Sequence, residues 1–404
     1  MRDRQATGRP GKWRRLAAAV AVSAGLAVAA PSAAHAGNGF FTSQDLTASG
    51  APVGASGKTT GWYTPWDRVR HVAYFNTSNV ITIASLAPGA STWSSATAPN
   101  VSPVGLVLTG YAYAWDRSSH VIYLGSDNHV HELWYTQDSP VWHDADLTAV
   151  TGAPSGLWPT TGYEQGGAQH IVASTTSTHV LYHLVFTPGT GWQAQNLTTF
   201  TDGGPYTTLL PVGVSRGDGQ TIAYLARDGF IHALSSTTGS GWSDVAIRQA
   251  VGANNVYAGL GIFFDAGGSR LAITYVGPVN PTPRHLHELT WTPSAGWSDS
   301  DVTAASGGPA FTGAGIGGGL SLASDGSDRI FTVDAANAIW EYVRVRGGRW
   351  FAWKDTGDGT VQANNDVTAF AAPDDAAGTS YTDYVVYLDG SGHPHVMDMT
   401  TPTS

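Results

Sequence analysis

The chain of 404 residues has no cysteine. This absence excludes disulfides, thiolate metal sites, covalent haem attachment and cysteine nucleophiles. The chain must therefore be held by its hydrophobic core, and it is long enough for that. The sequence also lacks the 3.6-residue apolar period of amphipathic helices. An all-β structure is left as the expected fold class.

Basic residues are concentrated at the N-terminus. Two arginines at 14–15 precede an apolar run at 16–30, and small residues form a cleavage motif at 34–36. This pattern is typical of a secretory signal peptide, compatible with either general or twin-arginine export. We expect residues 1–36 to be removed and residues 37–404 to form one secreted, extracellular domain.

The remaining chain is acidic. Residues 1–36 hold six basic residues and one acidic residue, which leaves 14 Lys and Arg against 29 Asp and Glu, a formal net charge of −15. A nucleic acid or an anionic membrane surface needs a basic face, so neither partner is expected. No later stretch is long and apolar enough to insert into a membrane.

Glycine and tryptophan are abundant instead, with 50 and 15 residues. Many turns, many aromatics and 12 % charged residues are typical of short strands. A tryptophan anchor recurs, and in its clearest copies Asp or Asn follows four residues later, then Leu or Val, then Thr. The anchors, 49 to 55 residues apart, are Trp93, Trp142, Trp192, Trp242, Trp297 and Trp350.

Alternating apolar segments joined by tight turns precede the anchors, a pattern typical of β-hairpins. The clearest hairpins span 120–136, 221–236, 329–345 and 384–399, and a further strand comes before the hairpins at 59–67, 108–116 and 159–167. Four short strands in about 50 residues indicate a β-propeller blade. Six anchored blades and one shared blade predict a seven-bladed β-propeller, with four antiparallel strands in each blade.

The two ends of the repeat complement each other. The last hairpin at 384–399 has no anchor after it, whereas the segment 39–52 has no hairpin before it. Phe41 and Asp45 keep the spacing between an anchor and its Asp. We therefore expect residues 40–47 to supply the outer strand of the last blade, which closes the ring and removes open sheet edges.

The repeated anchors and histidines have structural interpretations. A large ring at a fixed repeat position is expected to pack between neighbouring blades, and the Asp of the anchor motif to bond a neighbouring loop. Four histidines share one position and are interpreted as hydrogen-bonding residues: His131, His232, His287 and His395. Three of them form the pairs His129/His131, His285/His287 and His393/His395. The pairs lie on different blades and no carboxylate is placed to complete a site, so no metal or cofactor is expected.

A column of glutamates lies one position after these histidines. Glu132, Glu288 and Glu341 share it, and the other blades carry Ile83, Tyr182, Ala233 and Val396 there. Twelve residues before Glu341 is Arg329, twelve before Glu132 is His120, and Arg270 holds the corresponding place before Glu288 in a longer hairpin. Because a hairpin folds these positions toward each other, each pair is expected to make contact.

Two interpretations of these pairs stay open. A partly buried ion pair would fix the register of the hairpin. Alternatively, a guanidinium beside a carboxylate suits the vicinal hydroxyls of a sugar, and charged partners strengthen such bonds. Aromatic residues near the glutamates would supply an apolar face for the sugar ring: Trp134, Trp291, Trp340 and Tyr342.

This pattern of Arg, a Glu twelve residues later and nearby aromatics resembles the fungal fucose-specific lectins and related bacterial propeller lectins, over residues 40–400. In that family Arg and Glu hold sugar hydroxyls between blades, and aromatic residues stack on the sugar. Seven blades resemble the bacterial members more than the usually six-bladed fungal ones. The resemblance implies a carbohydrate-binding role for Arg329, Glu341, Trp340, Tyr342, His120, Glu132, Trp134, Arg270, Glu288 and Trp291.

Propellers also host enzymes, so the fold alone does not choose the function. A glycosidase needs two carboxylates near the axis, but the expected innermost strands are rich in Gly, Tyr and Ala, and only Glu164 sits well inside one. A polysaccharide lyase needs a basic clamp, for which basic residues are too scarce. Carbohydrate binding without catalytic residues is therefore favoured, with a polysaccharide lyase or glycoside hydrolase, or a protein-binding or structural propeller, as alternatives.

Overall fold

The computed structural model describes residues 41–400, apart from 56–57, 99–100, 176–177, 179, 202–209, 218, 248–255, 257, 266–267, 278–283, 311–315, 322–326, 335, 346–347, 356–360, 362–366 and 374–380. The chain divides into two units, Met1–Gly37 and Asn38–Ser404. The elements given below belong to the second unit. The signal peptide predicted at 1–36 lies outside the described residues.

Strands in the described residues form seven sheets of four antiparallel strands, numbered here blade 1 to blade 7. Blades 1 to 3 are β2 (Thr60–Thr64), β3 (Val69–Phe75), β4 (Ile81–Leu86) and β5 (Ser94–Thr97); β6 (Pro103–Tyr113), β7 (Ser118–Gly125), β8 (Val130–Thr136) and β9 (Ser139–Asp146); and β10 (Leu157–Gln165), β11 (Ala168–Thr175), β12 (Leu181–Thr187) and β13 (Gly191–Asn196). Blades 4 to 6 are β14 (Val212–Arg216), β15 (Gly219–Leu225), β16 (Ile231–Thr237) and β17 (Ser243–Ala246); β18 (Ala258–Phe264), β19 (Leu271–Gly277), β20 (His285–Thr292) and β21 (Gly296–Asp301); and β22 (Ile316–Ser321), β23 (Asp328–Val333), β24 (Ile339–Arg344) and β25 (Trp350–Asp355). Blade 7 is β26 (Thr368–Pro373), β27 (Tyr381–Leu388), β28 (Pro394–Thr400) and β1 (Phe41–Asp45).

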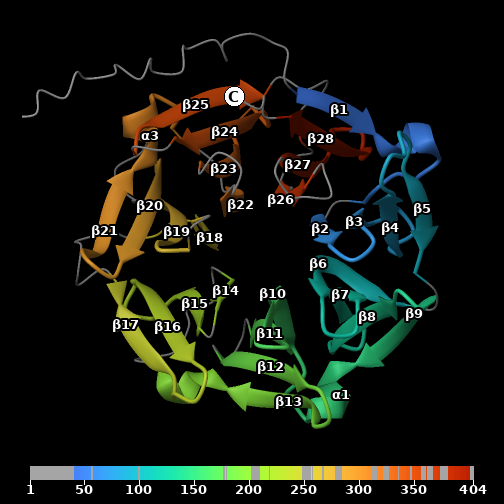
Figure 1. Ribbon diagram of the computed structural model, residues 1–404, viewed down its shortest axis with the longest axis horizontal. Helices are drawn as coiled ribbons and strands as arrows, with labels where there is room; N and C mark the ends of the chain where they lie inside the picture. Colours follow the sequence, from blue (N-terminus) through green and yellow to red (C-terminus); the bar gives the residue numbers. More distant parts are fainter. Residues whose placement is uncertain are drawn as a thin grey trace, which may run out of the picture. The chain divides into compact units, whose positions relative to one another are not determined.

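The blades follow one another around a central axis (Figure 1). The first strands of successive blades contact each other in the order β2, β6, β10, β14, β18, β22 and β26, and β26 contacts β2 again. This cycle returns to its start, so the sheets form a ring. The predicted all-β, seven-bladed β-propeller is confirmed.

Short helices follow several outer strands in the described residues: η1 (Leu46–Ser49), α1 (Leu147–Thr151), η2 (Leu197–Phe200) and α3 (Val302–Ser306). The Asp or Asn that ends each of these outer strands caps the helix. The Asp146 carboxylate accepts a hydrogen bond from the backbone N–H of Ala149, Asp301 caps α3 in the same way, and Asn196 caps η2. Gly152 ends α1 in the left-handed conformation that glycine adopts without strain. No helix among the described residues is long and apolar enough to cross a membrane.

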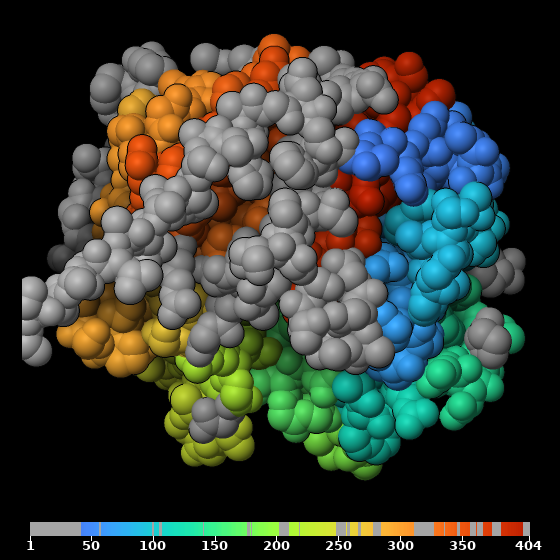
Figure 2. All heavy atoms as spheres, turned by 45° about the horizontal axis from the view of Figure 1, so that its top comes forward, coloured from blue at the N-terminus to red at the C-terminus, as the bar shows by residue number. Residues whose placement is uncertain are grey.

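The ring is closed by pairing of its two ends. β1 runs antiparallel to β28, with Phe41 opposite Met399 and Asp45 opposite His395. Figure 2 shows the N-terminal residues, in blue, against the C-terminal ones, in red. The expected closure is confirmed for residues 41–45, and the strand ends where η1 begins.

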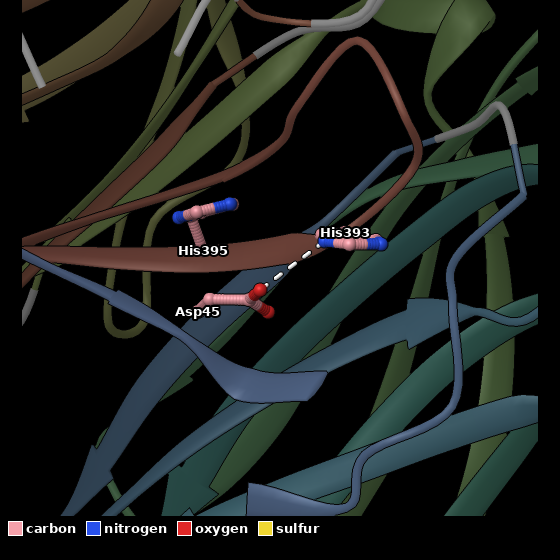
Figure 3. A group of neighbouring side chains, drawn as sticks. All are labelled: Asp45, His393 and His395. Atoms are coloured by element: carbon pink, nitrogen blue, oxygen red, sulfur yellow. Dashed lines mark hydrogen bonds and ion pairs between the residues drawn. The ribbon is translucent and has the colours of Figure 1, made fainter. Parts of the chain in front are cut away.

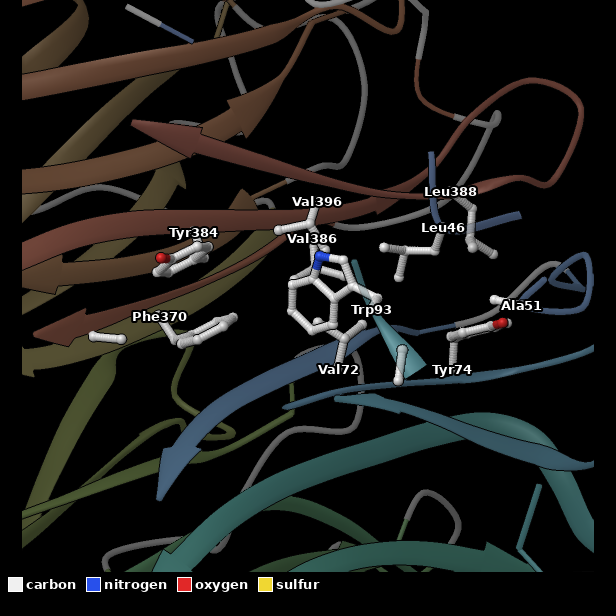
Figure 4. Packing of buried hydrophobic residues seen from close by; sticks show 12 residues of the cluster. Leu46, Ala51, Val72, Tyr74, Trp93, Phe370, Tyr384, Val386, Leu388 and Val396 are labelled. Carbon is white, nitrogen blue, oxygen red and sulfur yellow. The ribbon is translucent and has the colours of Figure 1, made fainter. Parts of the chain in front are cut away.

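The core lies between the blades rather than within them. In one cluster, Trp93 of blade 1 lies among Val72 of its own blade and Val386 and Val396 of blade 7 (Figure 4). Each remaining anchor packs against the cluster that joins its blade to the preceding one; these anchors are Trp142, Trp192, Trp242, Trp297 and Trp350. The expected packing of the anchors between neighbouring blades is confirmed.

Removing residues 37–48 should strongly destabilise the ring, because it leaves β28 with an open edge and removes the buried Leu46. Leu46→Ala alone should lower the free energy of unfolding by about 2–5 kcal/mol. Val150→Ala, which changes a side chain that is 62 % exposed, is the control. Thermal unfolding followed by circular dichroism measures both. A truncated protein that melts like the full chain would show that β1 does not close the ring.

Candidate functional site

The three predicted pairs of side chains are formed. They are His120–Glu132, with Nδ1 and Oε1 2.7 Å apart, Arg270–Glu288, with Nη1 and Oε1 3.1 Å apart, and Arg329–Glu341, with Nη1 and Oε1 2.9 Å apart. Each glutamate lies on the third strand of its blade, and its partner lies at the start of the second strand or just before it. The hairpin geometry expected from the sequence therefore brings each pair together.

Two details of the predicted column were wrong. In blade 3 the column residue is His183, opposite Val172, whereas Tyr182 faces the other side of the sheet. The hairpin of blade 3 is one residue longer than that of blade 2, which shifts the register. In blade 5, Ala272 occupies the strand position expected for Arg270, and Arg270 reaches Glu288 from just before β19.

The pair in blade 5 belongs to a buried network of four charges. Arg344 of blade 6 binds both oxygens of Glu288, at 2.9 and 2.8 Å, and it also binds Asp328 at 2.9 Å. Arg270 contacts the same Asp328. The Glu288 side chain is fully buried. Two guanidiniums thus balance two carboxylates between blades 5 and 6, an arrangement that fixes both hairpins.

The pair in blade 6 is similarly enclosed. Nε of Arg329 lies 3.1 Å from Oδ2 of Asp383 in blade 7, and the side chains of Arg329, Glu341 and Asp383 are at most 6 % exposed. The neighbouring Asp355 is buried as well, and burial together with the charge of Glu341 raises its pKa well above the usual range, although Arg329 opposes the shift. The ion-pair interpretation accounts for the contacts described here. A role of this pair in sugar binding stays a prediction.

The aromatic residues next to the glutamates do not form a common surface with them. Trp340 and Tyr342 flank Glu341 along one strand, so their side chains lie on the opposite face. Tyr342 is fully buried among residues of blade 5, and Trp340 donates to Asp334. Trp291 is also on the opposite face from its glutamate and is 38 % exposed. Only Trp134 shares a face with its glutamate, Glu132, and its ring stacks on that of His143.

Two hollows in the described part of the chain open between blades at the same repeat position. One, of about 400 Å³, lies between blades 1 and 2; the other, of about 320 Å³, lies between blades 3 and 4. The first is lined by His71, Ile83, Ser85, Tyr135 and Trp142. The second is lined at the equivalent positions by His170, His183, Val185, Ser236 and Trp242. Each hollow thus combines the column of one blade with the anchor of the next.

The residue three positions after the column lines or fills the space between two blades, and in the hollow between blades 1 and 2 it is Tyr135. It points toward the preceding blade, because it is an odd number of residues from the column. Between blades 5 and 6 this residue is Arg344, which fills the space and binds Glu288. Between blades 3 and 4 it is the small Ser236, which lines the hollow. Spacing along one hairpin of the sequence does not reveal this contribution from the next blade.

Neutral polar groups line the hollow between blades 3 and 4. His170 Nδ1 lies 2.9 Å from His183 Nε2, and the Trp242 indole donates to Gln195 at 3.1 Å. Burial lowers the pKa of His170 to about 4 and that of His183 well below its usual value, so both rings are neutral at pH 7. Nδ1 of His183 has no hydrogen-bond partner among the described residues. This hollow therefore offers an unused ring nitrogen beside an aromatic face.

The repeated histidines have the hydrogen bonds expected of structural residues. For example, Nδ1 of His232 lies 3.0 Å from Oδ2 of Asp244, which also accepts from Tyr224. One expectation about the histidine pairs was wrong, because carboxylates do lie beside them. Oδ2 of Asp146 is 2.8 Å from Nδ1 of His129, and blades 5 and 7 repeat the contact. These carboxylates belong to the outer strand of the same blade, which the hairpin sequence does not reveal.

The acid inside an inner strand has a structural contact. Oε2 of Glu164 accepts a hydrogen bond from the backbone N–H of Ala114 at 2.7 Å, and so ties blade 3 to blade 2. A glycosidase would need a second carboxylate placed to act with this one. The contact gives Glu164 a role in joining two blades.

No family model matches the chain, and no curated protein matches it. Its fold is similar to that of solved propeller proteins. A lectin from Burkholderia pseudomallei has a TM-score of 0.67 at 10 % identity, covering 86 % of this chain and 96 % of that chain. AofleA from Arthrobotrys oligospora has a TM-score of 0.52 at 14 % identity, with 80 % and 92 % covered. A lectin from Aleuria aurantia, solved in complex with α-methyl-L-fucoside, has a TM-score of 0.50 at 15 % identity, with 77 % and 100 % covered. The resemblance to these lectins is confirmed at the level of the fold.

Glu341→Ala should lower the free energy of unfolding by about 3–5 kcal/mol, because Arg329 would lose a buried partner. Asp138→Ala, which removes an exposed carboxylate, is the control and should change stability by less than about 0.5 kcal/mol. Denaturant unfolding measures both. Unchanged stability together with lost glycan binding would instead identify the pair as a sugar site.

The contribution of the buried His170 and His183 to stability should fall as the pH falls from about 7.5 to about 5. The pKa of His170 and His183 is lower in the folded protein than the usual value near 6.5, so the unfolded chain binds more protons in this range. Each fully buried histidine should contribute a loss of about 2 kcal/mol at pH 5. His183→Gln should reduce this slope of stability against pH, whereas His143→Gln, at an exposed position, should not. An equal slope in the His183 variant would contradict the explanation.

Proposed function

We propose that this chain is a secreted carbohydrate-binding protein whose sugar sites lie between neighbouring blades. The N-terminal signal expected from the sequence supports secretion. The similarity in fold to lectins supports the class of ligand. The two hollows between blades supply the location, and they are the observation on which the proposal depends most.

Each hollow combines features that suit a sugar. The anchor ring, Trp142 or Trp242, offers an apolar surface to the C–H face of a pyranose. Histidine, serine and glutamine side chains beside it can donate and accept hydrogen bonds from hydroxyl groups. A volume of 320–400 Å³ is at the lower end of the range for small-molecule sites and is enough for one or two sugar units.

The described lining of the hollow between blades 3 and 4 has no Asp, Glu, Lys or Arg, which favours a neutral sugar there, whereas Asp67 lines the hollow between blades 1 and 2. In the hollow between blades 3 and 4 the column residue is His183, and His170 lies beside it. Both rings are neutral at pH 7. The net negative charge of the domain also disfavours a highly anionic polysaccharide. The charged pairs in blades 2, 5 and 6 are enclosed, and in this proposal they hold the ring rigid around the open sites.

Two equivalent sites on one rigid ring would act together on a surface that displays many glycans. Single sites for small sugars are usually weak, and linking two sites raises the effective affinity without new contacts. We therefore expect weak binding of a free monosaccharide and much stronger retention on an immobilised glycan. The expected stoichiometry is two.

Filling one hollow should remove one site and leave the other. Ser236→Phe introduces the residue found at the equivalent position of blade 3, Phe186, where the interface is packed. Trp242→Ala removes the proposed stacking surface and should weaken binding at that site by about tenfold to a hundredfold. A glycan array on the mature protein selects the ligand, with α-methyl-L-fucoside as the first monosaccharide probe. Calorimetry then measures affinity and stoichiometry.

Val245→Phe is the matched control, because it adds the same ring to an exposed position of the same blade. Its stoichiometry should stay at two, whereas that of Ser236→Phe should be one. The absence of binding to any glycan on the array would overturn the proposed function. Binding that persists unchanged when both hollows are filled would overturn the assignment of the sites.

A further inference from the structure

Two clusters of histidine and aspartate occupy the same repeat position in blades 2 and 7, away from the hollows. In blade 7 the possible ligand atoms of Asp45, His393 and His395 all lie within 4.8 Å of one another. Figure 3 shows Asp45 of β1 beside His393, which comes just before β28, together with His395 of β28. In blade 2 the corresponding group is Asp127, His129 and Asp146.

We propose that each of these clusters binds one zinc ion, or another divalent transition metal of similar preference. Imidazole nitrogen and carboxylate oxygen are ligands that Zn²⁺ prefers, and three protein ligands with one further group complete a tetrahedral site. The inference does not depend on the carbohydrate-binding proposal, because none of these residues lines a hollow.

The separation between Asp45 and His393 in blade 7 fits a tetrahedral ion. Zinc–ligand bonds of about 2.0–2.1 Å place neighbouring ligand atoms about 3.3 Å apart. Nδ1 of His393 lies 3.1 Å from Oδ2 of Asp45, and Nε2 of His395 lies 3.3 Å from Oδ2 of Asp389. Asp389 is also 4.0 Å from His393, so it is the fourth group beside the three ligands.

Blade 2 repeats these distances with other residues. Nδ1 of His129 lies 2.8 Å from Oδ2 of Asp146, and Nε2 of His131 lies 3.2 Å from Oδ2 of Asp127. Asp127 is 3.8 Å from His129. Each of these contacts differs from its counterpart in blade 7 by no more than 0.3 Å. The pairwise contacts are alike, but the ligand groups differ: the group in blade 7 includes His395, whereas that in blade 2 includes the turn residue Asp127.

The hairpin turns that supply Asp127 in blade 2 and Asp389 in blade 7 differ in sequence, although both place a carboxylate beside the histidines. Asp127 comes two residues before its histidine, whereas Asp389 comes four residues before His393. In blade 2 the carboxylate takes the space beside Gly125, where an added Cβ would lie only 2.5 Å from Oδ1 of Asp127. Two unrelated turn sequences thus deliver a carboxylate to the same place.

The outer-strand carboxylates are held in position by the helix caps. Oδ1 of Asp45 accepts from the backbone N–H of Thr47, and Oδ1 of Asp146 accepts from Ala149. The other oxygen, Oδ2, is the one that faces the histidine. A carboxylate fixed in this way is pre-oriented, as metal ligands usually are by their own hydrogen bonds. The side chain of His393 is 38 % exposed and that of Asp127 is 49 % exposed, so an ion can enter.

Blade 5 provides an internal comparison. It keeps the contact between His285 and Asp301, at 2.6 Å, and that between His287 and Asp299. The turn before these histidines, 277–283, contains no Asp, Glu or His. Blade 5 thus keeps counterparts of Asp45, His393 and His395 but lacks the turn carboxylate. Among the described residues its ligand atoms do not gather within 4.8 Å as those of blades 2 and 7 do, so we expect no zinc site in this blade.

A zinc ion in blade 7 would join the two ends of the domain. Asp45 and His393 are 348 residues apart in sequence. Asp45 ends β1, and His393 comes just before β28, the strand with which β1 pairs. A link across so long a loop restricts the unfolded chain more than a local link does. Zinc should therefore raise the melting temperature, and the blade 7 site should account for most of the rise.

The test is calorimetric titration of Zn²⁺ into metal-free mature protein that carries no histidine tag. The expected stoichiometry is two. His393→Asn should reduce it to one, as should His129→Asn, and the double variant should bind none. Asp127→Asn tests the blade 2 site with a less buried residue that caps no helix, and it should also leave one ion. His285→Asn is the matched control and should still bind two ions.

Melting temperatures with and without Zn²⁺ provide a second measurement. His393→Asn should lose most of the zinc-induced rise, whereas His129→Asn should keep most of it, and both variants should melt like the parent in chelator. No saturable binding up to millimolar Zn²⁺ would overturn the inference. A stoichiometry unchanged by the double variant would also overturn it and would leave the clusters as helix-cap clamps.

Discussion

Each blade has two apolar faces, and only a closed ring covers both of them. The anchor ring of one blade packs on the column of the blade before it, so each interface is built from two consecutive repeats. The first and last blades lack a neighbour in sequence and must find one in space. Pairing of β1 with β28 provides it, and Trp93 then packs against Val386 and Val396 as the other anchors do in their own interfaces. The geometry of every site on the ring depends on that closure.

The same position between blades serves two purposes. Where a glutamate occupies the column, a basic residue of the same or the next blade binds it, and Arg344 fills the interface beside Glu288. Where the column carries His183 or Ile83, a small or polar residue leaves room and a hollow opens. A buried charge needs a partner, so the charged interfaces are the closed ones. The two hollows lie at interfaces whose column residue is not a glutamate.

The anchor motif likewise combines two tasks in one side chain. One carboxylate oxygen of Asp146 begins a short helix, and the other faces His129. The helix cap is a local interaction, readable from Asp, Leu and Thr in sequence. The contact with histidine joins the outer strand to the hairpin turn. It became visible only when the register of β8 and β9 was known.

The sequence by itself determined the repeat, the number of blades, the closure by the N-terminal strand and the contact of Arg329 with Glu341. These depend on spacing along one hairpin or on a count, both of which the sequence contains. Only the tertiary structure decided which of these positions face solvent. The hairpin of blade 3 is one residue longer, which places His183 rather than Tyr182 in the column. The residue that lines or fills the space between two blades comes from the next blade, about 50 positions away. Burial is a property of the assembled ring, and no single repeat encodes it.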